Sequence, residues 1–361
     1  MRQIRILVDS FADEDALNAQ MSNGREIVSR LDPARFHVSM FTVGKPDARI
    51  ALRPATRLIQ LPQRRQTVKI LNEFLWGKHD ILFYLKPSPA AKLYLALRLK
   101  WFDRRIVIGM VESQSDLRKE PTVKPEQVRI WEQTVLRSDT LFSNSSSVRA
   151  SLEKEYGLPS EVVPTGVDSK FYTPAWDRAR NSRVRVLFVG ALRPFKGPQL
   201  LLRAAAQFRE VDFIIVGDGV MASELETQVR EQGLTNVEFA RGLKPPSLRE
   251  QYRRADIFLF PSRWEGSPKV ILEAAACGLP VVARSDYQPE TVVRGRTGYL
   301  GGSDDELVDH LAKLVASPEL RRDMGRASRT LSERFDWDLI TRQWEEIFIR
   351  LAGHRGGSGP A

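Results

Sequence analysis

One stretch, residues 257–283, constrains the fold more than any other, because it places a strand, a loop, a helix and a second strand in direct succession. The apolar run 257–260 has the length of a buried strand. Ser267 is expected to cap the helix, and Gly278 lies where a helix C′ glycine is expected. The apolar run 280–283 completes a βαβ unit, which predicts parallel strands.

Strand-like and helical segments alternate along most of the chain. The first-half strands are expected at residues 5–10, 36–44, 57–62, 80–85, 104–112 and 140–145, the last of which runs into a Ser/Asn loop. The polar segment 173–183 lacks periodicity and is interpreted as a linker, after which the alternation resumes. The alternation predicts an α/β protein with two doubly wound, Rossmann-like parallel-sheet domains that face each other across a cleft.

The domain boundaries follow from this pattern. We expect an N-terminal domain at 1–173, a C-terminal domain at 184–336, a helix at 337–352 that crosses back to the N-terminal domain, and a disordered tail at 353–361. Ligands of such sheets bind at the carboxyl ends of the strands, so the expected site lies there.

Composition excludes several classes of protein. The 361 residues include one cysteine, Cys277, and four scattered histidines, which excludes an internal disulfide framework and argues against a metal site. No apolar window is long enough for a transmembrane helix and no signal peptide is recognised, so a cytoplasmic location is expected. The net charge of +10 fits a phosphate-bearing substrate, an anionic membrane or nucleic acid, or simply a basic surface.

Two carboxylates and one lysine suggest a site for a sugar phosphate. Glu265 lies in the loop before the helix of the opening stretch and Glu273 lies within that helix. Backbone amides at a helix start attract anions. Lys196 and Arg193 follow a strand in a glycine-bearing turn, where they would face phosphate oxygens, although an ordinary βα turn has the same appearance.

Together these segments resemble a known family. The pieces VGALRPFKG, VGDG, FPSRWEG, EAAACGLPVVA and PETVVRGRTGYL, with PTGVDSKFYTP before them, are similar in order and spacing to retaining glycosyltransferases of the GT-B fold. The group is glycosyltransferase family four, also called glycosyl transferases group 1. The resemblance covers residues 4–344 and is closer in the second half.

The resemblance implies a role for each matching residue. Glu273 would bind the ribose hydroxyls, Glu265 the transferred sugar, and Lys196 the diphosphate. The resemblance implies that Glu265 and Lys196 are catalytic. Arg193 and Glu112 are candidate catalytic residues that stand in for a usual arginine and histidine. The donor-binding residues implied are Glu273, Gly190, Gly266, Ser267, Pro268, Lys269, Val270, Arg241, Gly242, Leu243, Gly217 and Asp218. No metal and no other cofactor are implied.

The chain departs from the family pattern at three places. Ala191 stands where an arginine usually follows the glycine, and Arg193 is the candidate replacement. Glu112 stands where a histidine is common, at the end of a first-half strand. In the first-half glycine-rich loop, residues 18–20 and a helix cap at 22–24 replace the usual glycines.

A basic and apolar segment, residues 86–105, has two interpretations. Its lysines and arginines would lie on anionic lipid while Tyr94, Trp101 and Phe102 enter the bilayer, or it is a core helix with a solvated basic edge. The first interpretation predicts a peripheral protein on the inner face of the cell membrane with a lipid-linked acceptor.

The sequence therefore predicts a retaining, metal-independent glycosyltransferase that uses a nucleotide-sugar donor and a sugar or lipid-linked acceptor. A nucleotide-sugar epimerase of the same fold is an alternative, although few acid or base side chains are found for it. A nucleic-acid-binding protein is an alternative from another class, and it lacks any recognised motif.

Overall fold

The computed structural model describes residues 2–15, 19–98, 105–113, 123–177 and 182–353, which form two compact units. Unit 1 is Met1–Thr165 with Trp337–Ala361, and unit 2 is Gly166–Asp336. The division falls at Thr165, inside the PTGVD segment, whereas the sequence placed the first boundary at residue 173. Residues 178–181 of the expected linker and the expected tail from 354 onward lie outside the described residues.

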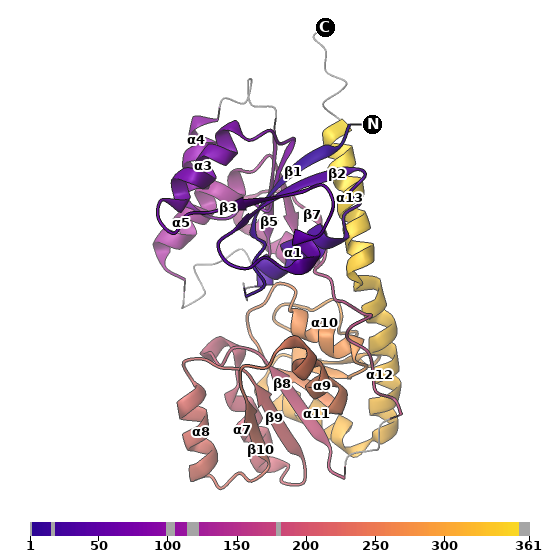
Figure 1. Ribbon diagram of the computed structural model, residues 1–361. Helices are drawn as coiled ribbons and strands as arrows, with labels where there is room; N and C mark the ends of the chain where they lie inside the picture. Colours follow the sequence, from indigo (N-terminus) through magenta and orange to yellow (C-terminus); the bar gives the residue numbers. More distant parts are fainter. Residues whose placement is uncertain (1, 16–18, 99–104, 114–122, 178–181, 354–361) are drawn as a thin grey trace. The chain divides into compact units, whose positions relative to one another are not determined.

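Unit 1 is built on a seven-stranded parallel sheet (Figure 1). The strand order is β3-β2-β1-β4-β5-β6-β7. The strands are β1 (Ile4–Phe11), β2 (Phe36–Thr42), β3 (Thr56–Gln60), β4 (Ile81–Phe83), β5 (Ile106–Val111), β6 (Thr140–Ser143) and β7 (Glu161–Val162). The order reverses between β1 and β4, so the crevice of a doubly wound sheet lies at the carboxyl ends of these two strands.

Helices cover both faces of the unit 1 sheet because alternate strand residues are apolar on each face. Ile6, Val8 and Met40 pack against α1 (Ala19–Arg30) and α13 (Trp337–Gly353). Leu7 and Phe41 pack on the other face, against α3 (Gln66–Trp76) and α4 (Pro89–Leu97). The other helical segments among the described residues of unit 1 are α2 (Ala48–Ala51), α5 (Pro125–Thr134), η2 (Val135–Arg137) and α6 (Ser146–Tyr156).

Unit 2 contains a six-stranded parallel sheet of the order β10-β9-β8-β11-β12-β13. The strands are β8 (Arg185–Val189), β9 (Asp212–Val216), β10 (Val237–Ala240), β11 (Ile257–Phe260), β12 (Val281–Arg284) and β13 (Gly298–Gly301). The helices are η3 (Pro194–Lys196), α7 (Gln199–Gln207), α8 (Ala222–Glu231), α9 (Pro245–Arg254), α10 (Lys269–Ala276), α11 (Asp304–Ala316), α12 (Pro318–Ser332) and η4 (Glu333–Phe335). Here the order reverses between β8 and β11. The two doubly wound Rossmann-like sheets confirm the predicted fold class.

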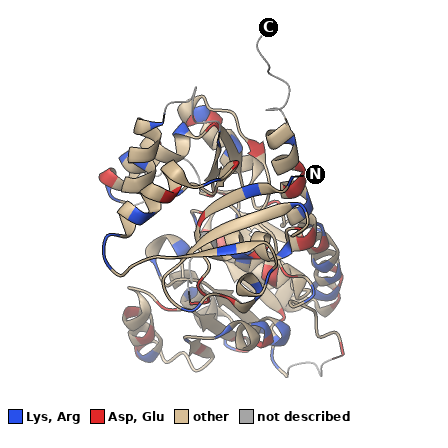
Figure 2. Ribbon diagram, turned by 45° about the horizontal axis from the view of Figure 1, so that its top comes forward, with Lys and Arg blue, Asp and Glu red and all other residues tan. Residues whose placement is uncertain are grey.

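Charged side chains are distributed over the helices of both units. Lys and Arg alternate with Asp and Glu along these helices in the view of Figure 2. Many of the cations take part in ion pairs, such as Arg30 with Asp338 at 3.0 Å and Arg98 with Asp139 at 2.7 Å. Much of the positive charge is therefore already paired within the protein.

Two expected helix starts differ from the structure. The segment 22–24 does not cap a helix, because α1 already begins at Ala19 and 22–24 form its second turn. The helix of the opening stretch, α10, begins at Lys269 with Pro268 as its N-cap residue, so Ser267 does not cap it. A proline fits the N-cap position here because it needs no donor N–H.

The lipid interpretation of residues 86–105 does not fit Tyr94, Arg98 and Arg105. Tyr94 is fully buried against Phe74, with ring centroids 5.5 Å apart. The Arg98 side chain is buried and pairs with Asp139, and the Arg105 guanidinium donates to the carbonyl of Leu75 at 2.9 Å. The alternative, a core helix with a basic edge, fits these contacts, while Trp101 and Phe102 lie outside the described residues.

Candidate functional site

The carboxyl ends of β8 and β11 carry the two loops that the sequence singled out in unit 2. The backbone N–H of Arg263 donates to the carbonyl of Phe195 at 2.8 Å, which joins the loops. Gly197 is needed at this contact, since its φ is +65° and a Cβ atom would lie 2.8 Å from the carbonyl oxygen of Pro261. Strand adjacency therefore brings together residues that are about seventy positions apart in the sequence.

Lys196 and Glu265 meet at this junction. The Lys196 ammonium forms an ion pair with Glu265 Oε1, and Ser262 Oγ donates to the same oxygen at 2.6 Å. The ammonium also lies 5.3 Å from the ring centroids of Phe195 and Phe260. The pair is largely shielded from water, with 18% and 13% of the side-chain surfaces exposed. A cation and a carboxylate that the sequence analysis singled out separately are thus held together.

The Glu273 carboxylate lies within α10. Tyr252 OH donates to Glu273 Oε2 at 2.9 Å. Burial raises the pKa of the Glu273 carboxyl, against the opposing effects of Lys269 and the tyrosine hydrogen bond. Tyr172 is a second hydrogen-bond partner of this half-buried carboxylate, which still retains lone pairs for hydroxyl groups of a ligand.

The helix start beside Glu265 supplies donors. The amide of Val270 lies in the first turn of α10, where helix geometry provides no intrahelical acceptor, while the amide of Ile271 donates to Pro268 O at 3.1 Å. The buried indole N–H of Trp264 has no acceptor among the described residues. Gly266 is buried and Ser267 is half-buried in the same loop. Hydrogen-bond donors are therefore available in the loop and helix start that adjoin the Lys196–Glu265 ion pair.

The glycine turns after β8 and β9 are in direct contact. A Cβ atom at Gly217 would lie 1.9 Å from the carbonyl oxygen of Gly190, so the two turns approach too closely for any side chain. The amide of Leu192 donates to Asp218 O at 2.8 Å, and the exposed Asp218 carboxylate accepts from the amide of Gly219 at 2.7 Å. Gly190, Gly217 and Asp218 therefore line the same edge of the sheet.

Two of the predicted basic residues do not take part in the Lys196–Glu265 junction. Arg193 is exposed, and no ion pair joins its side chain to another described residue. Arg241 forms an ion pair with Glu226 of α8, on a turn in which Gly242 has a φ of +61°. Leu243 packs against the core of unit 2.

Glu112 lies at the corresponding edge of unit 1, directly after β5. Its Oε1 accepts from Tyr84 OH and, at 2.9 Å, from Asn23 Nδ2. Tyr84 follows β4 with a left-handed φ of +66°, which is uncommon for a bulky residue and turns its hydroxyl toward Glu112. Burial, followed by the charge of Glu112, raises the pKa of the Tyr84 hydroxyl, so it remains a proton donor.

A second buried carboxylate lies nearby in unit 1. Asp9, near the end of β1, is 6% exposed and accepts from the backbone N–H of Lys86 at 2.8 Å. Burial raises its pKa to about 6, despite the opposing charge of Lys86. The Lys86 ammonium is buried over the Phe11 ring and has no hydrogen-bond acceptor among the described residues.

A cavity of about 240 Å³ opens beside this cluster. Tyr84, Lys86, Glu112, Gln127 and Trp131 are among the residues that line it. It contains a cation, a carboxylate, an amide and aromatic surface at the carboxyl ends of β4 and β5, the edge where a doubly wound sheet binds ligands.

Several of these residues were not predicted from the sequence, namely Ser262, Trp264, Tyr252, Tyr84, Lys86 and Asp9. A weak signal existed for Asp9, because it is the one carboxylate in its strand and directly follows the apolar run 6–8. Tyr84 and Lys86 gave no such signal, since Tyr84 lies within the apolar run 81–85 and Lys86 directly follows it.

The described ranges lack both a metal-binding cluster and a membrane-spanning helix. They contain no group of three or more His, Cys, Asp or Glu side chains placed to hold a metal ion. None of their helices has the length and hydropathy needed to cross a bilayer.

Comparison with known proteins agrees with this geometry. Residues 177–331 match the family described as glycosyl transferases group 1. The chain is 35% identical over 269 residues to a D-inositol 3-phosphate glycosyltransferase of Corynebacterium jeikeium, an alignment that covers 66% of this chain and 64% of that protein. The chain thus spans less than two thirds of the length of that relative.

Two further matches extend over more of the chain. The structure of sucrose-phosphate synthase from Thermosynechococcus elongatus superposes with a TM-score of 0.82 at 22% identity, covering 98% of this chain and 100% of that one, which shows the GT-B fold. A GDP-mannose-dependent alpha-(1-6)-phosphatidylinositol monomannoside mannosyltransferase of Mycolicibacterium smegmatis is 30% identical over 331 residues, 84% of this chain and 83% of that protein. The chain belongs to the glycosyl transferases group 1 family.

Proposed function

We propose that this protein is a retaining glycosyltransferase of family four that transfers a sugar from a nucleotide-diphosphate sugar to an acceptor hydroxyl without a metal ion. The observation that carries the proposal is the Lys196–Glu265 pair at the strand-order reversal of unit 2. A cation, a carboxylate and helix-start amides at that edge suit a phosphate joined to a hydroxylated ring.

The proposed chemistry depends on stabilising the leaving group. As the bond between the anomeric carbon and the diphosphate oxygen breaks, negative charge grows on the diphosphate. Lys196 and the α10 amides would stabilise that charge in a site partly closed to water. The acceptor hydroxyl attacks the anomeric carbon on the face that the diphosphate leaves, and its proton passes to the departing phosphate oxygen.

The two glutamates would have separate tasks. Glu265 would accept hydrogen bonds from hydroxyls of the transferred sugar once donor phosphate attracts the Lys196 ammonium away from it. Glu273, fixed by Tyr252, would accept from the ribose hydroxyls. The glycine turns at Gly190 and Gly217 would allow the diphosphate to approach the backbone.

On the acceptor side, Glu112 and Lys86 line the cavity of unit 1. The names of two relatives refer to inositol 3-phosphate and to a phosphatidylinositol mannoside. From these names we propose that the acceptor of this protein is a hydroxyl-rich, phosphate-bearing molecule, either free or lipid-linked. For the lipid-linked form, the protein would act at the inner face of the cell membrane, and the donor named for the second relative, GDP-mannose, is the first to test.

The test measures nucleoside diphosphate release from UDP-, GDP- and ADP-sugars with inositol phosphate and phosphatidylinositol as acceptors. Lys196→Ala should lower kcat by about a hundredfold or more because it removes the main countercharge. Glu273→Ala should mainly raise KM for the donor. Lys313→Ala, an exposed lysine of α11, is the matched control and should leave both constants unchanged.

The product and the metal requirement complete the test. NMR of the product should show the anomeric configuration of the donor, and EDTA should leave the rate unchanged. An inverted product, or activity lost in EDTA and restored by a divalent ion, contradicts that part of the proposal. Conversion of the donor sugar without any acceptor would indicate an epimerase instead.

A further inference from the structure

A polar cavity in unit 1 lies at the opposite strand ends from Glu112. It has a volume of about 600 Å³, within the range of small-molecule sites. Its floor is formed near the amino ends of β1, β2 and β3 by Arg5, His37, Ser39 and Arg57, and its wall by α3 and the turn that follows it.

The sequence is unusual at the floor of this cavity. Side chains of a strand alternate between faces, so Arg5 shares a face with Leu7, His37 and Ser39 share one with Phe41, and Arg57 with Ile59. Further along each strand these positions form the apolar core under α3 and α4. Polar residues at core-facing strand positions cost stability unless they are paired or serve a function.

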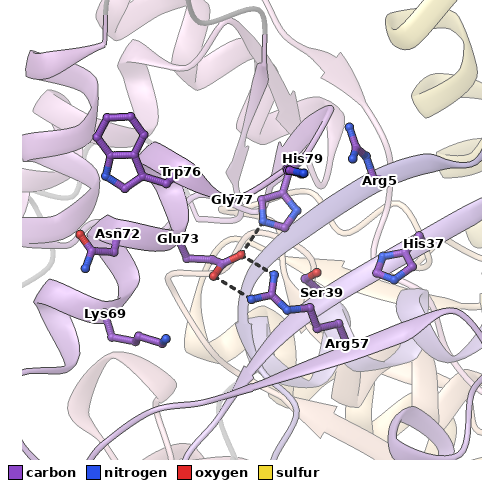
Figure 3. Close-up of a pocket in the computed structure, with 11 residues that line it drawn as sticks. Arg5, His37, Ser39, Arg57, Lys69, Asn72, Glu73, Trp76, Gly77 and His79 are labelled. Carbon is purple, nitrogen blue, oxygen red and sulfur yellow. Dashed lines mark hydrogen bonds and ion pairs between the residues drawn. The ribbon is translucent and has the colours of Figure 1, made fainter.

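The carboxylate of Glu73, which lines the cavity, already accepts hydrogen bonds from other side chains of the lining. Glu73 of α3 accepts two hydrogen bonds from the Arg57 guanidinium, at 2.7 and 3.1 Å, and one contact from His79 Nε2 at 2.9 Å (Figure 3). Burial alone would raise the pKa of Glu73, but the bonds from Arg57 and His79 outweigh it and lower the pKa. Glu73 therefore stays ionised and fixes both partners in place.

The other polar groups of the cavity are available to a ligand. No hydrogen bond joins the side chains of His37, Ser39 and Lys69 to another described residue. Lys78 adds a second exposed ammonium. Of the four cations in the lining, Arg57 pairs with Glu73 and Arg5 pairs with Asp80 at 3.6 Å. Lys69 and Lys78 form no ion pair with another described residue, so an anion is favoured.

Trp76 adds a flat apolar surface at the rim. It is the last residue of α3 and 80% of its surface is exposed, although it is among the largest apolar side chains. An exposed indole beside ammonium groups provides a stacking surface for a sugar or base ring.

We propose that this cavity is a second ligand site, which binds a phosphate-bearing ring compound through Lys69, Lys78 and Arg57, with the ring on Trp76. Because it lies at the amino ends of the strands, its ligand would not compete with a substrate beside Glu112 in the same unit. The phosphate group is the shared chemistry, and a soluble sugar phosphate or a lipid headgroup could supply it.

Titration calorimetry of the full chain tests the site with glucose 6-phosphate, glucose, inorganic pyrophosphate and phosphatidylinositol vesicles. Glucose 6-phosphate should bind and glucose should not. The double variant Lys69→Glu with Lys78→Glu should weaken binding by about tenfold or more, since two attractive charges become repulsive. Lys154→Glu, on the exposed face of α6, is the matched control and should leave binding unchanged.

Two further variants separate the site from the others. Trp76→Ala should weaken glucose 6-phosphate binding and leave pyrophosphate binding at this site unchanged. Lys196→Ala should leave glucose 6-phosphate binding intact, which distinguishes this site from the proposed donor site. Hydrogen exchange should show protection of residues 66–80 on binding.

The outcomes decide the proposal. Binding to phosphatidylinositol vesicles alone, lost in the double variant, supports the site with a lipid headgroup as the source of both phosphate and ring. No saturable binding to any phosphate probe, or binding that survives the double variant and is lost in Lys196→Ala, overturns it. Failure here leaves the proposed transfer reaction untouched, because that reaction depends on nucleotide binding in unit 2.

Discussion

Asp9 illustrates, at the scale of one residue, how burial changes the chemistry of a carboxyl group. Its folded-state pKa of about 6 lies above the ordinary value of 3.8. A group whose pKa is raised on folding stabilises the protein below its unfolded pKa, and that contribution is lost as pH rises through the folded pKa. Ionised Asp9 should therefore cost on the order of 3 kcal/mol of stability at pH 7.

The substitution Asp9→Asn should remove this cost. Asparagine retains an oxygen that can accept the N–H of Lys86 but cannot ionise. We expect the free energy of unfolding at pH 7 to rise by up to about 3 kcal/mol and its decline between pH 4 and 6.5 to become shallower. Urea unfolding at several pH values measures both.

The control is Asp15→Asn, an exposed aspartate of the same unit, which should leave the pH profile unchanged. If Asp9→Asn lowers stability at pH 7 while preserving the slope between pH 4 and 6.5, the buried carboxylate is stabilised by its surroundings and our assignment is wrong.

At the scale of elements, the loops after β8 and β11 are joined by backbone contacts that only particular residues allow. Gly197 and Gly233 both have left-handed φ values, +65° and +57°. They differ in their surroundings, since a Cβ atom at Gly197 would meet Pro261 O at 2.8 Å whereas a Cβ atom at Gly233 would meet no atom of the structure within 4 Å. The comparison separates backbone strain from the contact between loops.

Gly197→Ala should therefore be more harmful than Gly233→Ala. Both variants should lose about 1–2 kcal/mol of unfolding free energy, because alanine is strained in the left-handed conformation. The new Cβ atom of Gly197→Ala should also push the two loops apart. We expect Gly197→Ala to weaken nucleotide binding as well, because the Lys196–Glu265 pair is carried on these loops. Thermal unfolding and nucleotide titration measure the two effects.

Equal losses of stability in the two variants, together with unchanged nucleotide affinity in both, would show that the contact between Gly197 and Pro261 does not position the site.

At the scale of the whole molecule, the last helix completes the core of unit 1 although it follows all of unit 2 in the sequence. Trp344 of α13 is 1% exposed and its ring centroid lies 4.7 Å from that of Phe83 and 4.9 Å from that of Phe142. The core of unit 1 is therefore incomplete until the end of the chain has been synthesised.

Trp344→Ala should destabilise unit 1 by about 3–5 kcal/mol, because it leaves a cavity among large aromatic side chains. Hydrogen exchange should quicken in residues 2–165 and 337–353 and remain slow in 166–336. Leu339→Ala, whose side chain on the same helix is 42% exposed, is the matched control and should have little effect. Equal loss of protection in both units would show that they unfold as one.

Most of the fold and part of the site could be predicted from the sequence. Strand lengths and the alternation of strand and helix follow from local apolar patterns, so the elements were predicted closely, with errors at helix starts such as Lys269. Lys196, Glu265 and Glu273 were recognised because glycines, prolines and carboxylates have fixed spacing around them. These signals lie within short segments of the chain, so they can be recognised from the sequence alone.

The partners of these residues depend on strand order, which the local pattern does not encode. Only the adjacency of β8 and β11 joins Lys196 to Glu265, and only the adjacency of β1, β4 and β5 brings Asp9, Tyr84 and Glu112 to one edge. The sequence by itself determined two α/β domains with charged residues at strand ends. The tertiary structure decided which of those residues meet and which carboxyl groups are buried, because both depend on contacts between segments distant in the chain.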